Sequence, residues 1–167
     1  RTASGRMVLN EKNEEEEAYV SPYGDFVGGD RNDDRKGTVI VNGVQMIDSG
    51  LTKEDNKYHV SNSSALVKAF SLVTNGETVQ FKENIEQTDG ILITDKNLTI
   101  DLNDKTFTVS EGASTNNRNF KINGSSEVTI KNGTMVAAGD YSSGAYGTVR
   151  TEGTAKVTLT DVKLYNY

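Results

Sequence analysis

Lys96-Asn97-Leu98-Thr99-Ile100-Asp101-Leu102 is the stretch of sequence that decides the fold, because two later stretches repeat its pattern. The matching stretches are residues 126–132 and 155–161. Leu98, Val128 and Val157 hold the same place in the three stretches, at spacings of 30 and 29 residues. A fixed period of this length indicates stacked repeats, in which each unit buries its apolar side only against its neighbours.

Two further apolar positions keep nearly the same period. They are Ile91, Phe120 and Val149, at 29 and 29 residues, and Phe107, Met135 and Leu164, at 28 and 29. Within one repeat Val128 and Ile130 are predicted to point inward and Thr129 outward, because side chains alternate along a strand. The sequence therefore predicts about three stacked coils, each with three short parallel strands.

A short helix is predicted to precede the repeats. Ser63 or Ser64 is expected to cap it, and Asn75-Gly76 to end it. The apolar residues that follow the helical period on one face are Ala65, Leu66, Ala69, Phe70 and Val73. A short strand over residues 77–81 is expected next.

This region resembles the pectate-lyase-like β-helix superfamily. The resemblance rests on the helix over residues 64–73 followed by Gly76-Glu77-Thr78-Val79-Gln80-Phe81, and on the pattern over 98–106, which recurs over 128–134. It covers residues 63–167 and implies an all-β fold, a right-handed single-stranded parallel β-helix with a short N-terminal capping helix. The superfamily includes lyases, hydrolases, phage tailspikes, fibre proteins and surface adhesins, so the resemblance implies a fold and not one activity.

Three segments are predicted along the chain. Residues 1–36 are expected to be an extended or disordered attachment arm, and residues 37–62 a β-hairpin and a polar connector. The hairpin is indicated by Asn42-Gly43 between two apolar runs, because this dipeptide suits a type I′ turn. Residues 63–167 are the start of the β-helix. We expect more chain or a partner beyond Tyr167, because a solenoid otherwise ends in an open strand edge.

The arm is acidic, with four glutamates at 14–17. Its composition suits a disordered tail. The alternative is an arm that becomes ordered on a partner, anchored by apolar side chains that lie within it: Tyr19, Val20, Tyr23, Phe26 and Val27.

Composition argues against several classes of function. The formal net charge is −6, which disfavours nucleic acid and anionic lipid as partners. No apolar run approaches the ~20 residues of a membrane span. The chain has no cysteine and one histidine, His59, to which we assign a structural or solvent-exposed role. The sequence predicts no cofactor, and Asp30-Arg31-Asn32-Asp33-Asp34 lacks the spacing of a calcium loop.

Candidate contact residues lie on the repeats. The repeat alignment places Lys121 and Arg150 outward on neighbouring coils, near Asp89 and Glu152. Lyases of the superfamily use an arginine or lysine base on such a sheet, but lysine also occupies ordinary solvent-facing positions. Asp101 and Asp104 lie close together as well, and Asp104 is expected to serve a turn. No residue is assigned a catalytic role.

Two tyrosines lie in the glycine-rich stretch over 137–147. Tyr141 and Tyr146 could stack on a sugar or pack on a neighbouring chain, and the alternative is a flexible surface loop. Together with Lys121 and Arg150 they are the candidate contacts for a glycan or a partner.

The function expected from these features is that of a non-enzymatic phage structural protein, a head fibre, spike or tail fibre located in the virion. Residues 1–60 would bind a capsid or tail protein, and the β-helix would form a homotrimer and project toward host-surface polysaccharide. The alternatives are an extracellular polysaccharide lyase or hydrolase, and a bacterial surface adhesin.

Overall fold

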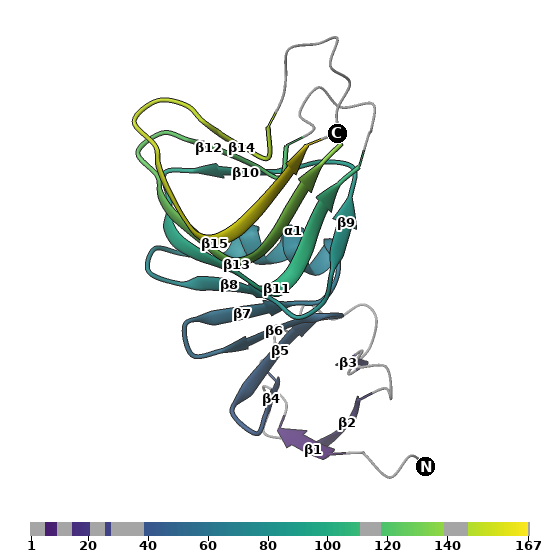
Figure 1. The fold of residues 1–167 in the computed structure, drawn as a ribbon. Helices are drawn as coiled ribbons and strands as arrows, with labels where there is room; N and C mark the ends of the chain where they lie inside the picture. Colours follow the sequence, from purple (N-terminus) through teal and green to yellow (C-terminus); the bar gives the residue numbers. More distant parts are fainter. Residues whose placement is uncertain are drawn as a thin grey trace.

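The chain folds almost entirely into β-strands, with one short helix, in a computed structural model (Figure 1). The structure describes residues 6–9, 15–20, 26–27, 39–110, 118–138 and 147–166. Among these residues the strands form three sheets, and the largest has nine strands. The predicted all-β class is therefore confirmed.

Three short strands lie in the segment that was predicted to be an arm. β1 (Arg6–Leu9) pairs antiparallel with β2 (Glu15–Val20), which pairs antiparallel with β3 (Phe26–Val27). The sequence pattern did not predict this pairing, because neither apolar period persists there. Among the predicted anchors, Tyr19 pairs with Val27 and Val20 pairs with Phe26 through the backbone, while Tyr23 lies outside the described residues.

The predicted hairpin is confirmed. β4 (Val39–Val41) and β5 (Val44–Asp48) pair antiparallel, and Asn42 and Gly43 between them both have positive φ angles, 52° and 83°. These angles suit the type I′ turn that an Asn-Gly pair favours.

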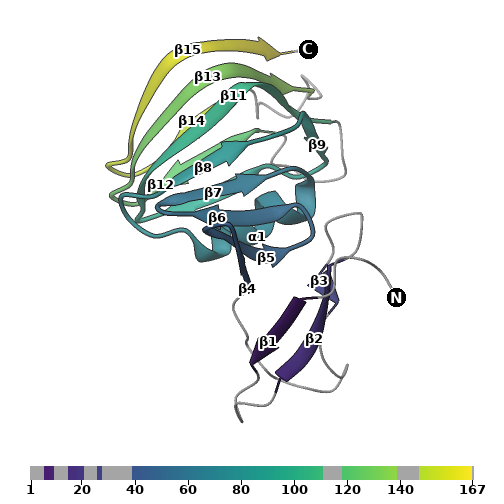
Figure 2. The ribbon, with the colours of Figure 1, turned by 90° about the horizontal axis from the view of Figure 1, so that it is seen from below.

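The predicted polar connector is wrong, because residues 48–62 contain a second hairpin. β6 (Leu51–Glu54) and β7 (Lys57–Val60) pair antiparallel around a turn in which Asp55 has a φ of 50°. β7 then pairs in parallel with β8 (Thr78–Phe81). The hairpins therefore continue the large sheet, which runs from β15 to β4 in Figures 1 and 2.

Along the chain, helix α1 (Ser63–Leu72) follows the hairpins and precedes the repeats. Its cap is Asn62, whose side chain accepts a hydrogen bond from the Ala65 amide, and not Ser63 or Ser64 as predicted. The predicted apolar face is buried, and Phe70 on it lies 6.0 Å from Phe120, measured between ring centroids. The helix thus covers the apolar interior at the start of the repeats.

The predicted ladders are confirmed in register. After β8 and β9 (Ile85–Gln87), each repeat contributes a short and a long strand. These pairs are β10 (Ile91–Thr94) with β11 (Asn97–Val109), β12 (Phe120–Asn123) with β13 (Glu127–Ala137), and β14 (Val149–Thr151) with β15 (Lys156–Asn166). Equivalent strands pair in parallel, and all three predicted sets of apolar residues are direct partners.

Each long strand bends at one corner. The bend is made by residues with positive φ: Asn103 and Asp104 in β11, Asn132 in β13 and Asp161 in β15. Asparagine and aspartate adopt this left-handed conformation more readily than other non-glycine residues. The prediction that Asp104 serves a turn is confirmed. The corner of β11 is also wider than that of β13. Three residues, Leu102, Asn103 and Asp104, separate the positions of β11 that pair with Lys131 and Gly133, whereas only Asn132 separates these two residues in β13.

The interior is a column of apolar side chains. Val128 and Ile130 are buried while Thr129 is partly exposed, so the predicted alternation is confirmed. Phe107 lies at the centre of the column, 5.6 Å from Phe81 and 5.3 Å from Phe120 between ring centroids. At β15 the column is uncovered within the described residues, because Leu159 and Leu164 are 42% and 47% exposed.

Candidate functional site

A charged cluster lies on the outer face of β12 and β14. Lys121 and Arg150 are direct partners in the parallel ladder, as the repeat alignment predicted. Both contact one carboxylate. The Lys121 Nζ lies 3.2 Å and the Arg150 guanidinium 2.7 Å from oxygens of Glu152. The structure therefore brings together three of the four charged residues that were predicted to lie near one another.

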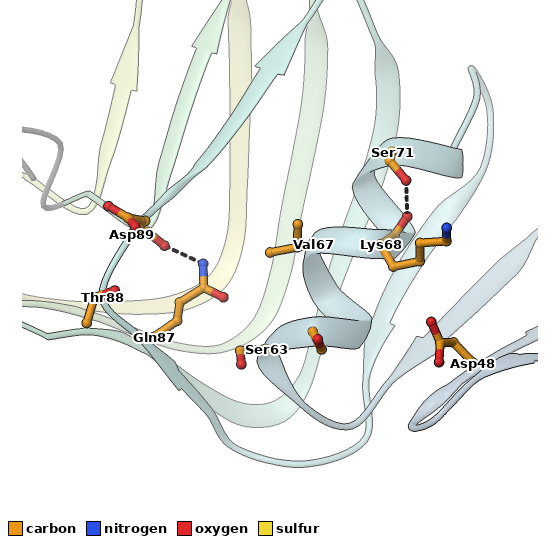
Figure 3. A pocket seen from close by; sticks show the side chains of 9 residues that line it. Asp48, Ser63, Val67, Lys68, Ser71, Gln87, Thr88 and Asp89 are labelled. Carbon is orange, nitrogen blue, oxygen red and sulfur yellow. Dashed lines mark hydrogen bonds between the residues drawn. The ribbon is translucent and has the colours of Figure 1, made fainter. Parts of the chain in front are cut away.

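Asp89, the fourth, forms no ion pair with Lys121 or Arg150 among the described residues. Its backbone carbonyl accepts a hydrogen bond from the Gln87 side chain, and its side chain lines a cavity beside helix α1 (Figure 3). The cavity has a volume of about 510 Å³ and lies between the loop after β9 and the outer side of the helix. The residues that line it are Asp48, Ser63, Ser64, Val67, Lys68, Ser71, Gln87, Thr88 and Asp89.

Arg118 is a third cation beside the cluster, and the sequence pattern did not predict it. Its residue is only 4% exposed, and its Nε has no hydrogen-bond partner among the described residues. Burial lowers the pKa of Arg118, the charge of Arg150 lowers it further, and Glu152 opposes both effects. The charges of Arg150 and Glu152 therefore both act on Arg118.

A second polar row crosses the large sheet. His59, Gln80, Asp101 and Lys131 are successive partners on β7, β8, β11 and β13. Asp101 accepts hydrogen bonds from the side chains of Gln80 and Asn132, at 3.2 and 3.1 Å, and from the Asn103 amide at 3.0 Å. These contacts tie the corner to its neighbours, so we assign Asp101 a structural role.

His59 is buried, which agrees with the structural role assigned to it, although it lies on strand β7 and not in a connector. Burial lowers its pKa below 6.5, and Lys82 and Lys57 add to this effect. Glu54, whose Oε2 lies 3.7 Å from the His59 Nε2, and Gln80 oppose it. The protonated form is therefore disfavoured in the folded chain.

We expect stability to fall in mild acid because of His59. A group with a lowered folded pKa binds its proton more readily in the unfolded chain, so its contribution is complete above the unfolded value of 6.5. The contribution is lost as the pH falls from there toward the folded pKa. Urea unfolding of the chain and of His59→Gln at pH values from about 8 to about 5 measures this. An equal loss in both proteins would show that carboxylates, and not His59, control the pH dependence.

Two predicted contact residues, Tyr141 and Tyr146, lie outside the described residues. No group of three or more histidine, cysteine or acidic side chains in the described part of the chain is arranged to hold a metal ion. In the same part, no helix is long and apolar enough to cross a membrane.

Comparisons with known proteins give no assignment. No protein-family model, no curated protein and no solved structure matches this chain. A functional proposal therefore depends on the geometry of the chain itself.

Proposed function

We propose that this chain is a non-enzymatic structural component of a phage particle, a head fibre, spike or tail fibre. In this proposal the segment up to residue 60 binds a capsid or tail protein, and the repeats project outward. The protein would be a homotrimer located in the virion, with host-surface polysaccharide as a further partner.

The observation that carries the proposal is the change in pairing along the chain. Every strand pair from β1 to β7 is antiparallel, whereas every pair from β7 onward is parallel. A stack of parallel repeats is rigid and elongated, and its length grows with the number of repeats. An antiparallel unit at one end of such a stack suits a protein that attaches at that end and extends away from it.

The finer architecture is also a proposal. We infer that the repeats are successive coils of a right-handed parallel β-helix of the pectate-lyase-like type. In support of this, each repeat supplies three strand segments that pair with the same segments of the next repeat. Parallel crossovers in proteins are almost always right-handed, which favours that hand here.

The charged cluster supports a structural protein better than an enzyme. Lys121 and Arg150 are both paired with Glu152, which suits cations that hold an anion better than a free base that abstracts a proton. The cluster nevertheless carries the second candidate, a polysaccharide lyase or hydrolase, because it combines two cations with a carboxylate on one sheet. If that candidate is correct, cleavage of an acidic polysaccharide by the purified chain should be abolished in Arg150→Ala.

A particle-level experiment tests the first proposal. Virions purified from the source would be analysed by mass spectrometry and by cryo-electron microscopy for this chain. Its presence, with residues 1–36 against a capsid or tail surface, is the expected result. A protein found only in free secreted form would overturn the virion proposal, and a cell-wall anchor in the full-length gene would favour a surface adhesin.

A further inference from the structure

The outer face of β12 and β14 carries more positive charge than its carboxylate can neutralise. Lys121 and Arg150 are paired with the single carboxylate of Glu152, and the charges of Arg150 and Glu152 both act on Arg118. We call these four residues the cation cluster. Three cations and one anion give a local charge of +2, in a chain whose net charge is −6. The excess is therefore a local property and not a consequence of overall composition.

The burial of Arg118 makes this excess of positive charge energetically unfavourable. A guanidinium removed from water is stable only with a partner that compensates for the lost hydration. The carboxylate that affects Arg118 already binds Arg150 at 2.7 Å and Lys121 at 3.2 Å. The Nε of Arg118 is buried and has no hydrogen-bond partner among the described residues. An additional anion at the cluster would lower this cost.

The cluster is also accessible. The side chains of Lys121 and Arg150 are 29% and 48% exposed, so donors on both can reach a ligand. Leu92 on β10 is the direct ladder partner of Lys121 and is 59% exposed. An exposed leucine beside two cations offers an apolar surface to the carbon skeleton of a molecule whose charged group lies on the cations.

We propose that the cation cluster binds an oxyanion group, a carboxylate, sulfate or phosphate, with Leu92 contacting the rest of the ligand. Arg150 suits this role because its planar guanidinium can donate two parallel hydrogen bonds to such a group. Lys121 supplies a point charge, and the positive charge of Arg118 adds to the potential at the cluster. Glu152 keeps the two exposed cations in position until the ligand arrives.

Isothermal titration calorimetry on the purified chain tests this, with sodium sulfate and sodium glucuronate as probes and glucose as the uncharged probe. Ionic strength is held constant with sodium chloride, because screening alone weakens surface attraction. We expect one or both anions to bind, glucose not to bind, and Lys121→Gln and Arg150→Gln each to weaken binding about tenfold. The matched control is Lys156→Gln, which removes an exposed lysine paired with Glu127 at 3.0 Å and should leave binding unchanged.

The pattern of binding separates the sources of the oxyanion. Binding of sulfate alone identifies a site for small free oxyanions. Binding of glucuronate, weakened by Leu92→Ser, identifies an acidic sugar residue whose ring contacts Leu92. If neither anion binds, or if Lys156→Gln weakens binding as much as Arg150→Gln, the proposal is wrong. The experiment uses the isolated chain, so its outcome is independent of whether the chain occurs in virions.

Discussion

Replacing Phe107 with alanine is expected to lower the free energy of unfolding by about 4 kcal/mol. Phe107 is fully buried and lies between the rings of Phe81 and Phe120, at centroid distances of 5.6 and 5.3 Å. Alanine would leave a cavity between two repeats, because the strands on both sides are held by parallel ladders and cannot close over it. Urea unfolding followed by circular dichroism measures the loss.

Two control variants make the measurement specific to the buried ring. Phe107→Leu keeps most of the apolar volume and should cost less than half as much as alanine. Thr108→Ala changes the next residue, which points outward and is partly exposed, and should lie within about 0.5 kcal/mol of the original chain. A loss below about 1 kcal/mol for Phe107→Ala would show that this ring does not form the centre of the core.

Replacing Gly90 with alanine is expected to cost about 3 kcal/mol, at the upper end for overpacking. A Cβ atom at Gly90 would overlap the backbone carbonyl oxygen of Arg118 in the next repeat. That carbonyl cannot move aside freely, because the Ile91 amide donates a hydrogen bond of 2.9 Å to the neighbouring Asn119 carbonyl. Asn119 is itself buried and donates side-chain hydrogen bonds to the carbonyls of Phe107 and Val136, at 2.7 and 3.1 Å.

Thermal unfolding of Gly90→Ala measures this close approach, with Asp89→Ala as the matched control. Asp89 is the exposed neighbour, and its truncation should change stability by no more than about 0.5 kcal/mol. If Gly90→Ala is as stable as the control, β10 and the start of β12 lie further apart than the structure places them.

The repeats were predictable because their physical cause is periodic. A residue that must point into a narrow column recurs whenever the chain returns to the same place. Leu98, Val128 and Val157 therefore keep their spacing in the sequence as well as their pairing in the sheet. The hairpin at Asn42-Gly43 was predictable for a local reason, since few other dipeptides adopt two positive φ angles.

Residues 48–62 were not predictable in the same way. Charged and polar residues dominate there, and the burial of β6 and β7 depends on only a few side chains, such as Leu51, Tyr58 and Val60. Such a short apolar pattern resembles that of a solvated loop unless it is known that β7 pairs with β8. The helix cap was missed by one residue, because Asn62, Ser63 and Ser64 are all suitable capping residues.

The candidate site was partly predictable. Register alone placed Lys121 beside Arg150 with Glu152 near both, because equivalent positions on stacked strands are neighbours. No pattern in the sequence indicated Arg118, since it precedes β12 and its burial depends on how the chain packs at that corner. Asp89 precedes β10 in a comparable way, and its side chain lies at the cavity beside α1.

The wide corner of β11 shows how this fold accommodates a change in chain length. Leu102 fills the extra space there, and Gly133 lies directly over it, where a Cβ atom would come within 2.5 Å of the Leu102 Cβ. In the following repeat, the ladder partner of Gly133 on β15 is Val162, an ordinary branched residue. An irregularity of two residues is thus compensated by a single small residue in the adjacent layer and is not transmitted beyond it. Insertions and deletions can therefore accumulate in evolution one layer at a time, each requiring adjustment only in its nearest neighbour.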